Sequence, residues 1–301
     1  MLQQYRGRFA PTPSGQLHLG SLVAAVSSYV DARAHTGQWL VRIDDIDIQR
    51  AVPGSADSIL RTLERFGLHW DGEIVYQSHR QDVYSECLNR LQKSKYLFNC
   101  ACSRTDIASR GRLNFLNEHV YPGTCYSNLN ATDFKKYSVR VHWPQECQHI
   151  EFTDQIQGPV IQNLAIDSGD LVLQRADKVF SYPFVVAIDD AMQGITHVVR
   201  GMDLLHQTPR QIAIQKLLNF SQAKYAHVPL IVDSAGFKLG KQTQAPAVEN
   251  ENPSKILFKV LSFLKLNPPL EIETFSVDKQ LLWAVENWNI ENLARISSIV
   301  V

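Results

Sequence analysis

Three features that are scarce or missing narrow the class of protein. The chain of 301 residues has only five cysteines. An odd, low number argues against a disulfide framework and for a reducing compartment, where close-set cysteines more often bind metal. No apolar run approaches the roughly 18 residues of a membrane span, and the first residues lack the basic head and apolar stretch of a signal peptide. We therefore expect a cytoplasmic protein without membrane association.

An excess of charge of either sign is also missing. Lys and Arg together number 30, and Asp and Glu together number 30. This balance excludes a uniformly basic coat for nucleic acid but leaves room for a local basic face. Hydrophobic residues make up 45% of the chain and charged residues 20%, which provides enough apolar surface for a sizeable core and excludes wholesale disorder.

The order of the expected elements predicts an α/β fold with a parallel sheet. Strands are expected over residues 6–9 and 39–43, and each is followed by apolar residues at helical spacing, first from Leu22 to Val30 and then from Ile59 to Phe66. Strand, helix, strand, helix is typical of parallel strands joined by crossovers. The pattern resumes later in the chain, with strands expected over 184–188, 197–200 and 229–232 and a helix over 209–219.

Residues 100–180 interrupt this pattern. They are rich in Cys, His, Asn and Gln and contain short β-like runs at 138–141 and 170–174. We expect an insertion that splits the parallel domain into halves at 1–99 and 181–245. Short helices are expected from about residue 254, in a final segment, 246–301, that is too small for a sizeable independent domain.

Two loops have features of phosphate-binding sites. Residues 11–21 connect an expected strand to an expected helix, and backbone N–H groups at a helix start bind anions well. Residues 236–242 contain two lysines three apart beside glycines. Taken alone, the first loop could instead be a rigid turn, and the second could be a solvated turn, without binding phosphate. The first loop matches neither of the two common glycine-rich nucleotide motifs, which disfavours those nucleotide-binding folds.

Taken together, these motifs resemble those of glutamyl-type class I aminoacyl-tRNA synthetases. The first loop reads Arg-Phe-Ala-Pro-Thr-Pro-Ser-Gly at 8–15 and then His-Leu-Gly at 18–20, like the opening of that family. Lys-Leu-Gly-Lys-Gln at 238–242 is similar to its second ATP loop, and Arg-Ile-Asp-Asp-Ile-Asp at 42–47 to its Arg-Ile-Glu-Asp-Thr-Asp. Further matches lie at 70–71, 76–78 and 199–204. The resemblance runs from about residue 6 to 245 and implies a Rossmann-like catalytic domain.

Within that family, the chain is more similar to a short paralogous branch that modifies tRNA. It stops near residue 301, so we expect no anticodon-binding domain. The first motif ends in Ser21 rather than a second His, and Ser127 stands where many glutamyl-tRNA synthetases have a fourth metal ligand. Members of the branch transfer glutamate to queuosine at the wobble position of tRNA(Asp). Two alternatives stay open: a truncated synthetase that charges a 3′ end, and a non-catalytic tRNA-binding paralogue.

The resemblance implies ATP-dependent activation of L-glutamate without tRNA, with Mg²⁺ screening the phosphates. His18 and Lys241 are the implied catalytic residues, because they can stabilise the charge that develops on the phosphates. The implied ATP-binding residues are Pro11, His18, Gly20, Ser21, Lys238 and Lys241. The implied glutamate-binding residues are Arg8, Phe9, Ala10, Pro11, Thr12, Asp44, Tyr182 and Arg200.

Glutamate has two carboxylates and one ammonium, so a selective site needs cationic forks and an anion. Arg8 and Arg200 can bind carboxylates, in either order, and Asp44 can bind the ammonium. Purely structural roles are the alternatives to glutamate binding: Arg8 could cap a helix, Asp44 could pair with Arg42, and Tyr182 could belong to the core. The sequence departs from the branch at three positions, where Thr12 replaces Ser, Asp44 replaces Glu and Gly240 replaces Ser. None of these changes removes a charge, so we expect activity to survive.

The cysteines form one candidate metal site. Cys100, Cys102 and Cys125 with Tyr121 can make a structural zinc site of three sulfurs and one oxygen. The one-residue gap is tighter than usual and tyrosine is a rare ligand, so the resemblance carries much of this expectation. His142 and His149 are alternative ligands if Tyr121 is not one. Isolated Cys87 and Cys147 are expected to be buried core residues.

The expected partners are ATP, L-glutamate and the anticodon stem-loop of tRNA(Asp) carrying queuosine, bound by a monomer. Sequence-specific RNA recognition favours such loops because their bases can be splayed out and stacked.

Overall fold

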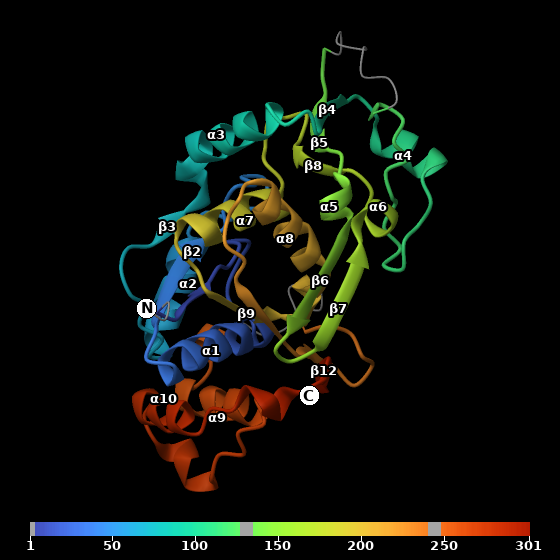
Figure 1. Ribbon diagram of the computed structural model, residues 1–301. Coiled ribbons are helices and arrows are strands. Elements are labelled where there is room, and N and C mark those ends of the chain that lie inside the picture. Colours follow the sequence, from blue (N-terminus) through green and yellow to red (C-terminus); the bar gives the residue numbers. More distant parts are fainter. Residues whose placement is uncertain (1–3, 127–134, 240–247) are drawn as a thin grey trace.

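The computed structural model describes residues 4–126, 135–239 and 248–301 (Figure 1). The α-helices are α1 (Leu19–Ala34), α2 (Ser55–Arg65), α3 (Gln81–Gln92), α4 (Arg104–Arg110), α5 (Gln145–Gln148), α6 (Leu164–Asp167), α7 (Tyr182–Met192), α8 (Thr208–Leu217), α9 (Pro253–Phe263) and α10 (Val277–Glu286). The strands are β1 (Arg6–Phe9), β2 (Gln38–Ile43), β3 (Val75–Tyr76), β4 (Leu97–Cys100), β5 (Ser138–Val141), β6 (His149–Asp154), β7 (Gly158–Asn163), β8 (Leu171–Gln174), β9 (His197–Gly201), β10 (Lys224–Val228), β11 (Leu230–Val232) and β12 (Ser298–Val300).

Parallel strands form the centre of the molecule, which confirms the predicted fold class. β1 pairs with β2 and β2 with β3, while β10 pairs with both β9 and β6, all in parallel. The two groups of strands meet at β1 and β9, where the Thr196 N–H donates to the Arg6 carbonyl at 2.9 Å. One hydrophobic core packs between the strands and α1, α2, α9 and α10, and a second packs against α3, α7 and α8.

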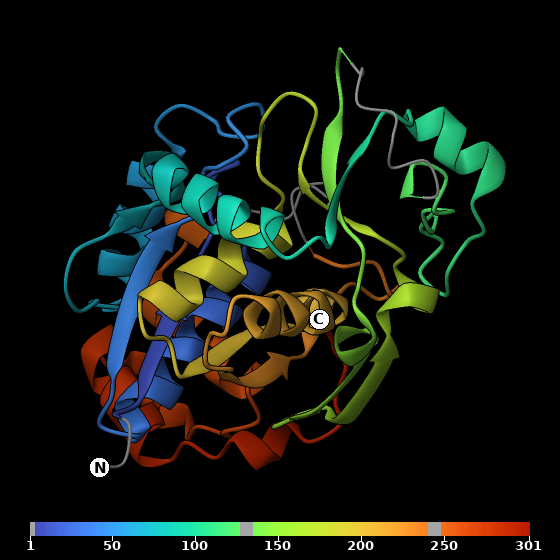
Figure 2. The same cartoon turned by 45° about the horizontal axis from the view of Figure 1, so that its top comes forward.

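The alternation of side chains along these strands places charged groups on a single face. Phe9, Val41 and Val199 belong to the core beneath α1. Their neighbours Arg8, Arg42 and Arg200 therefore point to the opposite face, because successive residues of a strand alternate. That face is covered by α7 and α8, the yellow and golden helices in Figure 2. The candidate active site is built between this face and α7.

The strand predicted over 184–188 is wrong, because these residues lie in α7. The helix begins after Ser181, with Pro183 in its first turn, where proline is tolerated because the missing N–H has no partner within the helix. A short continuous apolar run cannot be distinguished from a buried helix by periodicity alone. Phe184 to Ile188 are buried all round because α7 is enclosed on every side.

Residues 100–180 contribute to two separate sheets. Strands β4, β5 and β8 form an antiparallel sheet, and β5 and β8 lie where short β-like runs were predicted at 138–141 and 170–174. The hairpin of β6 and β7 instead joins the central strands through β10. One part of this segment is therefore continuous with the parallel sheet and brings Asp154 to it.

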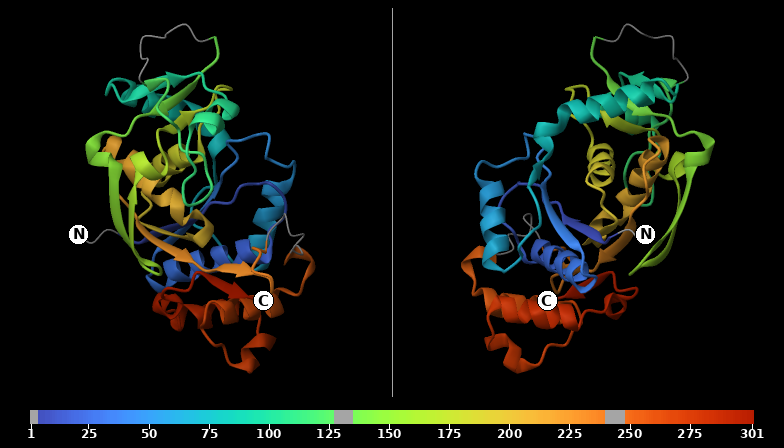
Figure 3. Two further views of the ribbon diagram at one scale, coloured as in Figure 1. Left: turned by 90° about the vertical axis from the view of Figure 1, so that its right-hand side faces the viewer. Right: turned by 60° about the vertical axis from the view of Figure 1, so that its left-hand side comes forward.

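The C-terminal segment packs on α1, at the end of the molecule opposite α4 (Figure 3). Asp31 of α1 accepts a hydrogen bond from the Trp288 indole at 2.8 Å. Strand β12 pairs in parallel with β11, the strand that leads into the second predicted ATP loop. Across the described ranges, the helices are all too short or too polar to span a membrane.

Candidate active site

The first predicted ATP loop leads directly into α1. His18 is the N-cap of that helix, and its Nδ1 accepts the Ser21 N–H at 3.3 Å, while the Ser21 hydroxyl lies 2.9 Å from Nε2. The start of the loop is tied to the end of β2, because the Asp44 N–H donates to the Pro11 carbonyl at 2.9 Å. The loop therefore presents a helix N-terminus beside β2, a geometry suited to an anion.

The second predicted loop meets the first at Gly20. A Cβ on Gly20 would lie 3.3 Å from the Leu239 carbonyl oxygen and 3.3 Å from the His18 ring, so there is little space for a larger side chain. The Lys238 ammonium pairs with Asp203 at 2.5 Å, and both groups are partly exposed. Lys241 and Gly240 lie outside the described residues. The structure thus brings His18, Gly20, Ser21 and the start of the second loop together.

A buried ion network holds Arg8 and Asp44. Arg8 donates through Nε and Nη2 to the two carboxylate oxygens of Asp190, at 3.2 and 3.3 Å. Arg42 bridges Asp190 and Asp44, with distances of 2.7 Å to each. Asp189 completes the group by accepting from Arg80 Nε at 2.7 Å. Three arginines thereby face three aspartates, and this balance makes their burial tolerable.

The buried carboxylates of Asp44 and Asp190 have pKa values shifted in opposite directions by their surroundings. Burial raises the pKa of Asp44 to about 6, although Arg42 opposes the shift. Burial also acts on Asp190, but Arg8 and Arg42 outweigh it and lower the pKa of Asp190 to about 2. The Oδ2 atom of Asp44 is buried without a hydrogen-bond partner among the described residues. Such an acceptor is costly unless something donates to it, so Asp44 keeps one free oxygen for a cation.

Arg200 lies on the same face of the sheet. Its Nη2 donates to the Thr208 hydroxyl at 2.7 Å and to the Gln211 side-chain oxygen at 2.8 Å. Its Nη1 is buried and, within the part of the chain that the structure describes, has no partner. Because arginine offers only donors, the free Nη1 fits an acceptor such as a carboxylate.

The other predicted glutamate-binding residues differ in their burial. Tyr182 begins α7 and is partly buried. Burial raises the pKa of the Tyr182 hydroxyl, and the charges of Arg200, Asp44 and Arg8 all act on it. Phe9 is in the core, whereas Ala10 and Pro11 are half-buried and Thr12 is exposed. For Asp44, the purely structural role considered above, an ion pair with Arg42, is present. Its second carboxylate oxygen nevertheless has no partner among the described residues.

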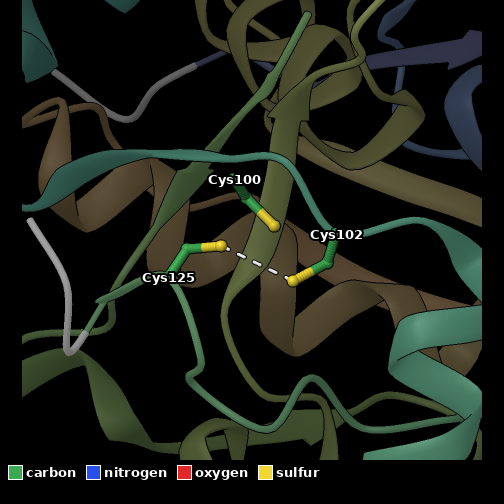
Figure 4. A group of neighbouring side chains, drawn as sticks. All are labelled: Cys100, Cys102 and Cys125. Atoms are coloured by element: carbon green, nitrogen blue, oxygen red, sulfur yellow. Dashed lines mark hydrogen bonds between the residues drawn. The ribbon is translucent and has the colours of Figure 1, made fainter. Parts of the chain in front are cut away.

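The three cysteines of the predicted metal site converge (Figure 4). The sulfurs of Cys100, Cys102 and Cys125 all lie within 4.8 Å of one another, and those of Cys102 and Cys125 are 3.5 Å apart. The Tyr121 hydroxyl accepts the Cys125 N–H at 2.8 Å. Zinc–sulfur bonds of about 2.3 Å in a tetrahedron need sulfurs roughly 3.8 Å apart. The cluster is therefore compatible with zinc.

Neither alternative histidine ligand belongs to the group of candidate metal ligands found among the described residues. His142 Nδ1 lies 2.9 Å from the Asp170 carboxylate, and its ring stacks on Tyr126. His149 opens β6 and is exposed. Ser127 lies outside the described residues. Cys87 and Cys147 are buried in the second core, as predicted.

Comparisons with known proteins place these motifs in a family. The model of "tRNA synthetases class I (E and Q), catalytic domain" matches residues 4–269. A curated relative from Dechloromonas aromatica is 45% identical over 100% of this chain and 99% of its own, and one from Thiobacillus denitrificans is 47% identical over 95% and 94%. Both are named glutamyl-Q tRNA(Asp) synthetase. The chain belongs to this family of class I tRNA synthetases.

Two solved structures support the same fold. A glutamate tRNA ligase from Elizabethkingia meningosepticum aligns with a TM-score of 0.78 over 98% of this chain, at 24% identity. A glutamate-tRNA synthetase from Elizabethkingia anophelis aligns with a TM-score of 0.77, at 23% identity. The chain spans 66% and 68% of their lengths. Membership of the synthetase family confirms the predicted class of ATP-dependent ligase.

Sequence reasoning missed several polar residues around the site of this synthetase family member. Asp189 and Asp190 end an apolar run, and two adjacent carboxylates inside such a run are a signal that could have been followed. Arg42 was considered only within a motif and as a possible partner of Asp44, not as a bridge to Asp190, although an arginine within a buried strand needs an anion. Asp154 and His227 gave no local signal, because they meet only through the pairing of β6 with β10.

Proposed function

We propose that this chain activates L-glutamate with ATP, without tRNA, and transfers it to queuosine at the wobble position of tRNA(Asp). The observation that carries the proposal is that two buried groups of the site, Nη1 of Arg200 and Oδ2 of Asp44, have no hydrogen-bond partner among the described residues. A carboxylate would accept from the first and an ammonium would donate to the second, which matches an amino acid. The relatives' printed name supplies glutamate and tRNA(Asp).

The residues can be assigned to the two substrates. Glutamate lies against the side chains of Arg8, Asp44, Tyr182 and Arg200. It also lies against the backbone of Phe9, Ala10, Pro11 and Thr12, since the Phe9 side chain belongs to the core beneath α1. ATP, with Mg²⁺, lies against Pro11, His18, Gly20, Ser21, Lys238 and Lys241. A glutamate carboxylate oxygen attacks the α-phosphorus and pyrophosphate leaves. His18 and the N-terminus of α1 stabilise the charge that develops on the phosphates, and Lys238 must exchange Asp203 for phosphate to contribute.

In the second step a hydroxyl of the queuosine cyclopentenediol attacks the carbonyl carbon of the glutamyl adenylate. An ester forms, AMP leaves with the bonding electrons, and the hydroxyl proton is lost. This is the reaction that a ribose hydroxyl undergoes in ordinary tRNA charging. A catalytic domain that reaches an anticodon loop can therefore keep the chemistry and change only the nucleotide presented to it.

A basic cavity beside the glutamate site is suited to the RNA. It has a volume of about 770 Å³, and its lining includes Ser181, which directly precedes Tyr182. Five cationic side chains line it against three carboxylates: Arg104, Lys136, Arg140, Arg175 and Arg210. Excess positive charge favours a phosphate backbone and makes binding weaken as salt rises.

Exposed Arg104 and Lys136 provide a test of this cavity. The double variant Arg104→Ala/Lys136→Ala should slow transfer to tRNA and reduce its salt dependence, while leaving glutamate-dependent ATP–pyrophosphate exchange unchanged. If transfer and exchange were lost equally, the result would contradict a role of this cavity in binding tRNA.

We also propose that Cys100, Cys102, Cys125 and Tyr121 hold a structural zinc. The converging sulfurs support this ligand set. The site ties the end of β4 to the loop after α4, so the metal would stabilise this part of residues 100–180 rather than take part in the reaction.

The decisive experiment has two stages. Purified protein with glutamate and ATP should support ATP–pyrophosphate exchange without tRNA. Labelled glutamate should then attach to tRNA(Asp) that carries queuosine and not to tRNA(Asp) from cells unable to make queuosine. The label should survive removal of the terminal adenosine. Equal labelling of both preparations, or loss of label with the 3′ end, would contradict modification and indicate a charging enzyme.

A further inference from the structure

A continuous polar contact crosses three strands beneath the glutamate site. The Asp154 carboxylate, at the end of β6, lies 2.6 Å from Nδ1 of His227 on β10. The Nε2 atom of His227 lies 3.0 Å from Nε of Arg200, which is paired directly beside it on β9. All three side chains are at most 5% exposed. Asp154 comes from the segment 100–180, far in sequence from the residues predicted to bind glutamate.

The chemistry of these atoms fixes the proton on His227. Arginine only donates, so the Nε2 atom that faces Arg200 must be an acceptor without a hydrogen. The hydrogen therefore sits on Nδ1 and is donated to Asp154. Burial lowers the pKa of His227 to about 4, so the ring is neutral at physiological pH. Burial raises the pKa of Asp154, but His227 and backbone N–H groups outweigh it and keep the carboxylate ionised.

These contacts hold the Arg200 guanidinium in one orientation. His227 holds Nε, and Thr208 and Gln211 hold Nη2, so two edges of the planar guanidinium are fixed. The third nitrogen, Nη1, is the buried one without a partner among the described residues. We propose that Asp154 and His227 are positioning residues that orient Arg200, so that its Nη1 meets a glutamate carboxylate. This inference rests on the proposed binding of glutamate.

The two oxygens of Asp154 separate this role from a structural one. Oδ1 accepts the backbone N–H groups of Ile156 and Gln157, at 3.0 and 2.9 Å, and that of His227 at 3.1 Å. Those bonds shape the turn between β6 and β7. Oδ2 contacts the His227 ring. Asp154→Asn can keep an oxygen for the turn while replacing Oδ2 with an NH₂ group.

That substitution reverses the hydrogen bonds toward Arg200. The amide NH₂ donates to Nδ1 of His227, so the ring hydrogen moves to Nε2 and faces the Arg200 Nε–H. The Thr208 hydroxyl, 3.1 Å from Nε2, is then the acceptor left for that hydrogen, and it already accepts from Arg200 Nη2. We expect the KM for glutamate in ATP–pyrophosphate exchange to rise about tenfold or more, by analogy with the loss of groups that orient metal-binding side chains. The KM for ATP should change little. Equal changes in both KM values with a lower melting temperature would show a structural role and overturn the proposal.

His227→Gln supplies the matched background. A glutamine oxygen can accept from Arg200 Nε without any partner at Asp154. Asp154→Asn should therefore change the KM for glutamate by less than about twofold when made in His227→Gln, the limit expected for uncoupled sites. If the two substitutions instead change the KM for glutamate by independent factors that multiply, Asp154 does not act through His227.

Nitrogen-15 NMR of labelled histidine gives a readout independent of activity. His227 should carry its hydrogen on Nδ1 in the wild type and on Nε2 in Asp154→Asn. An Nε2–H form in the wild type would overturn the inference whatever the substrate. Absence of glutamate-dependent exchange in the wild type would instead overturn the proposed function, so the two failures are distinguishable.

Discussion

Arg8 and Asp190 form a buried ion pair with two hydrogen bonds, at 3.2 and 3.3 Å, between β1 and α7. Arg42 approaches the same carboxylate from β2 at 2.7 Å. One aspartate of the helix thus holds two arginines of the sheet, including one proposed to contact glutamate. The rigidity of the site depends on this carboxylate as well as on the residues that touch substrate.

Asp190→Asn should strongly destabilise the fold, because it leaves two buried guanidinium groups without their shared anion. Removing one partner of a buried ion pair costs about 3–5 kcal/mol. Urea unfolding monitored by circular dichroism measures the free energy of unfolding. Asp177→Asn is the control, since its pair with Arg175 is exposed and should contribute less than about 1 kcal/mol. Similar losses in both variants would contradict the importance of the network.

Gly20→Ala should impair the use of ATP without destabilising the protein. The new methyl group would press on the Leu239 carbonyl and the His18 ring, each 3.3 Å away, and so separate the two loops. Alanine is the better helix former by about 1 kcal/mol, so thermal stability should hold or rise. We expect a several-fold higher KM for ATP in exchange assays, with the KM for glutamate nearly unchanged. An unchanged KM for ATP would show that the loops do not need this approach.

The affinity for glutamate should fall in mild acid. Asp44 binds the ammonium only when ionised, and burial raises its pKa to about 6. As pH falls through 6 the carboxylate gains a proton, so the KM for glutamate should rise by up to about tenfold per pH unit below that value. Exchange assays at saturating ATP between pH 5 and 8 measure this. Asp44→Asn should be weak at every pH, and Asp44→Glu should restore a pH-dependent KM. A flat wild-type profile would exclude Asp44 from this role.

Zinc content and stability should fall together in Cys102→Ser. We expect about one zinc per chain in the wild type, and loss of a thiolate ligand weakens both metal binding and folding. Metal analysis and thermal melting provide the two measurements. Cys147→Ser is the control, because Cys147 is buried in the second core and should lower stability while retaining zinc. Loss of zinc in both variants would point to general unfolding instead.

Local sequence patterns were sufficient to predict the strands and helices whose periodicity is clear. Residues 6–9 and 138–141 form the predicted strands, and α1 and α8 form where helices were predicted. Local patterning is sufficient there because a half-buried helix or strand repeats its apolar positions at its own period. The sequence also grouped Arg8, Asp44, Tyr182 and Arg200 as one candidate site, since family motifs are local strings of residues.

The contacts that hold those groups depend on long-range packing and could not be predicted from local sequence. Residues 184–188 form a helix because α7 is enclosed on all sides, and an apolar run without periodicity does not distinguish the two outcomes. Asp190 reaches Arg8 across 182 positions, and Asp154 reaches His227 across 73. Such contacts follow from which strands become neighbours. Strand order is a property of the whole chain, because it is fixed by burial of all its apolar faces at once.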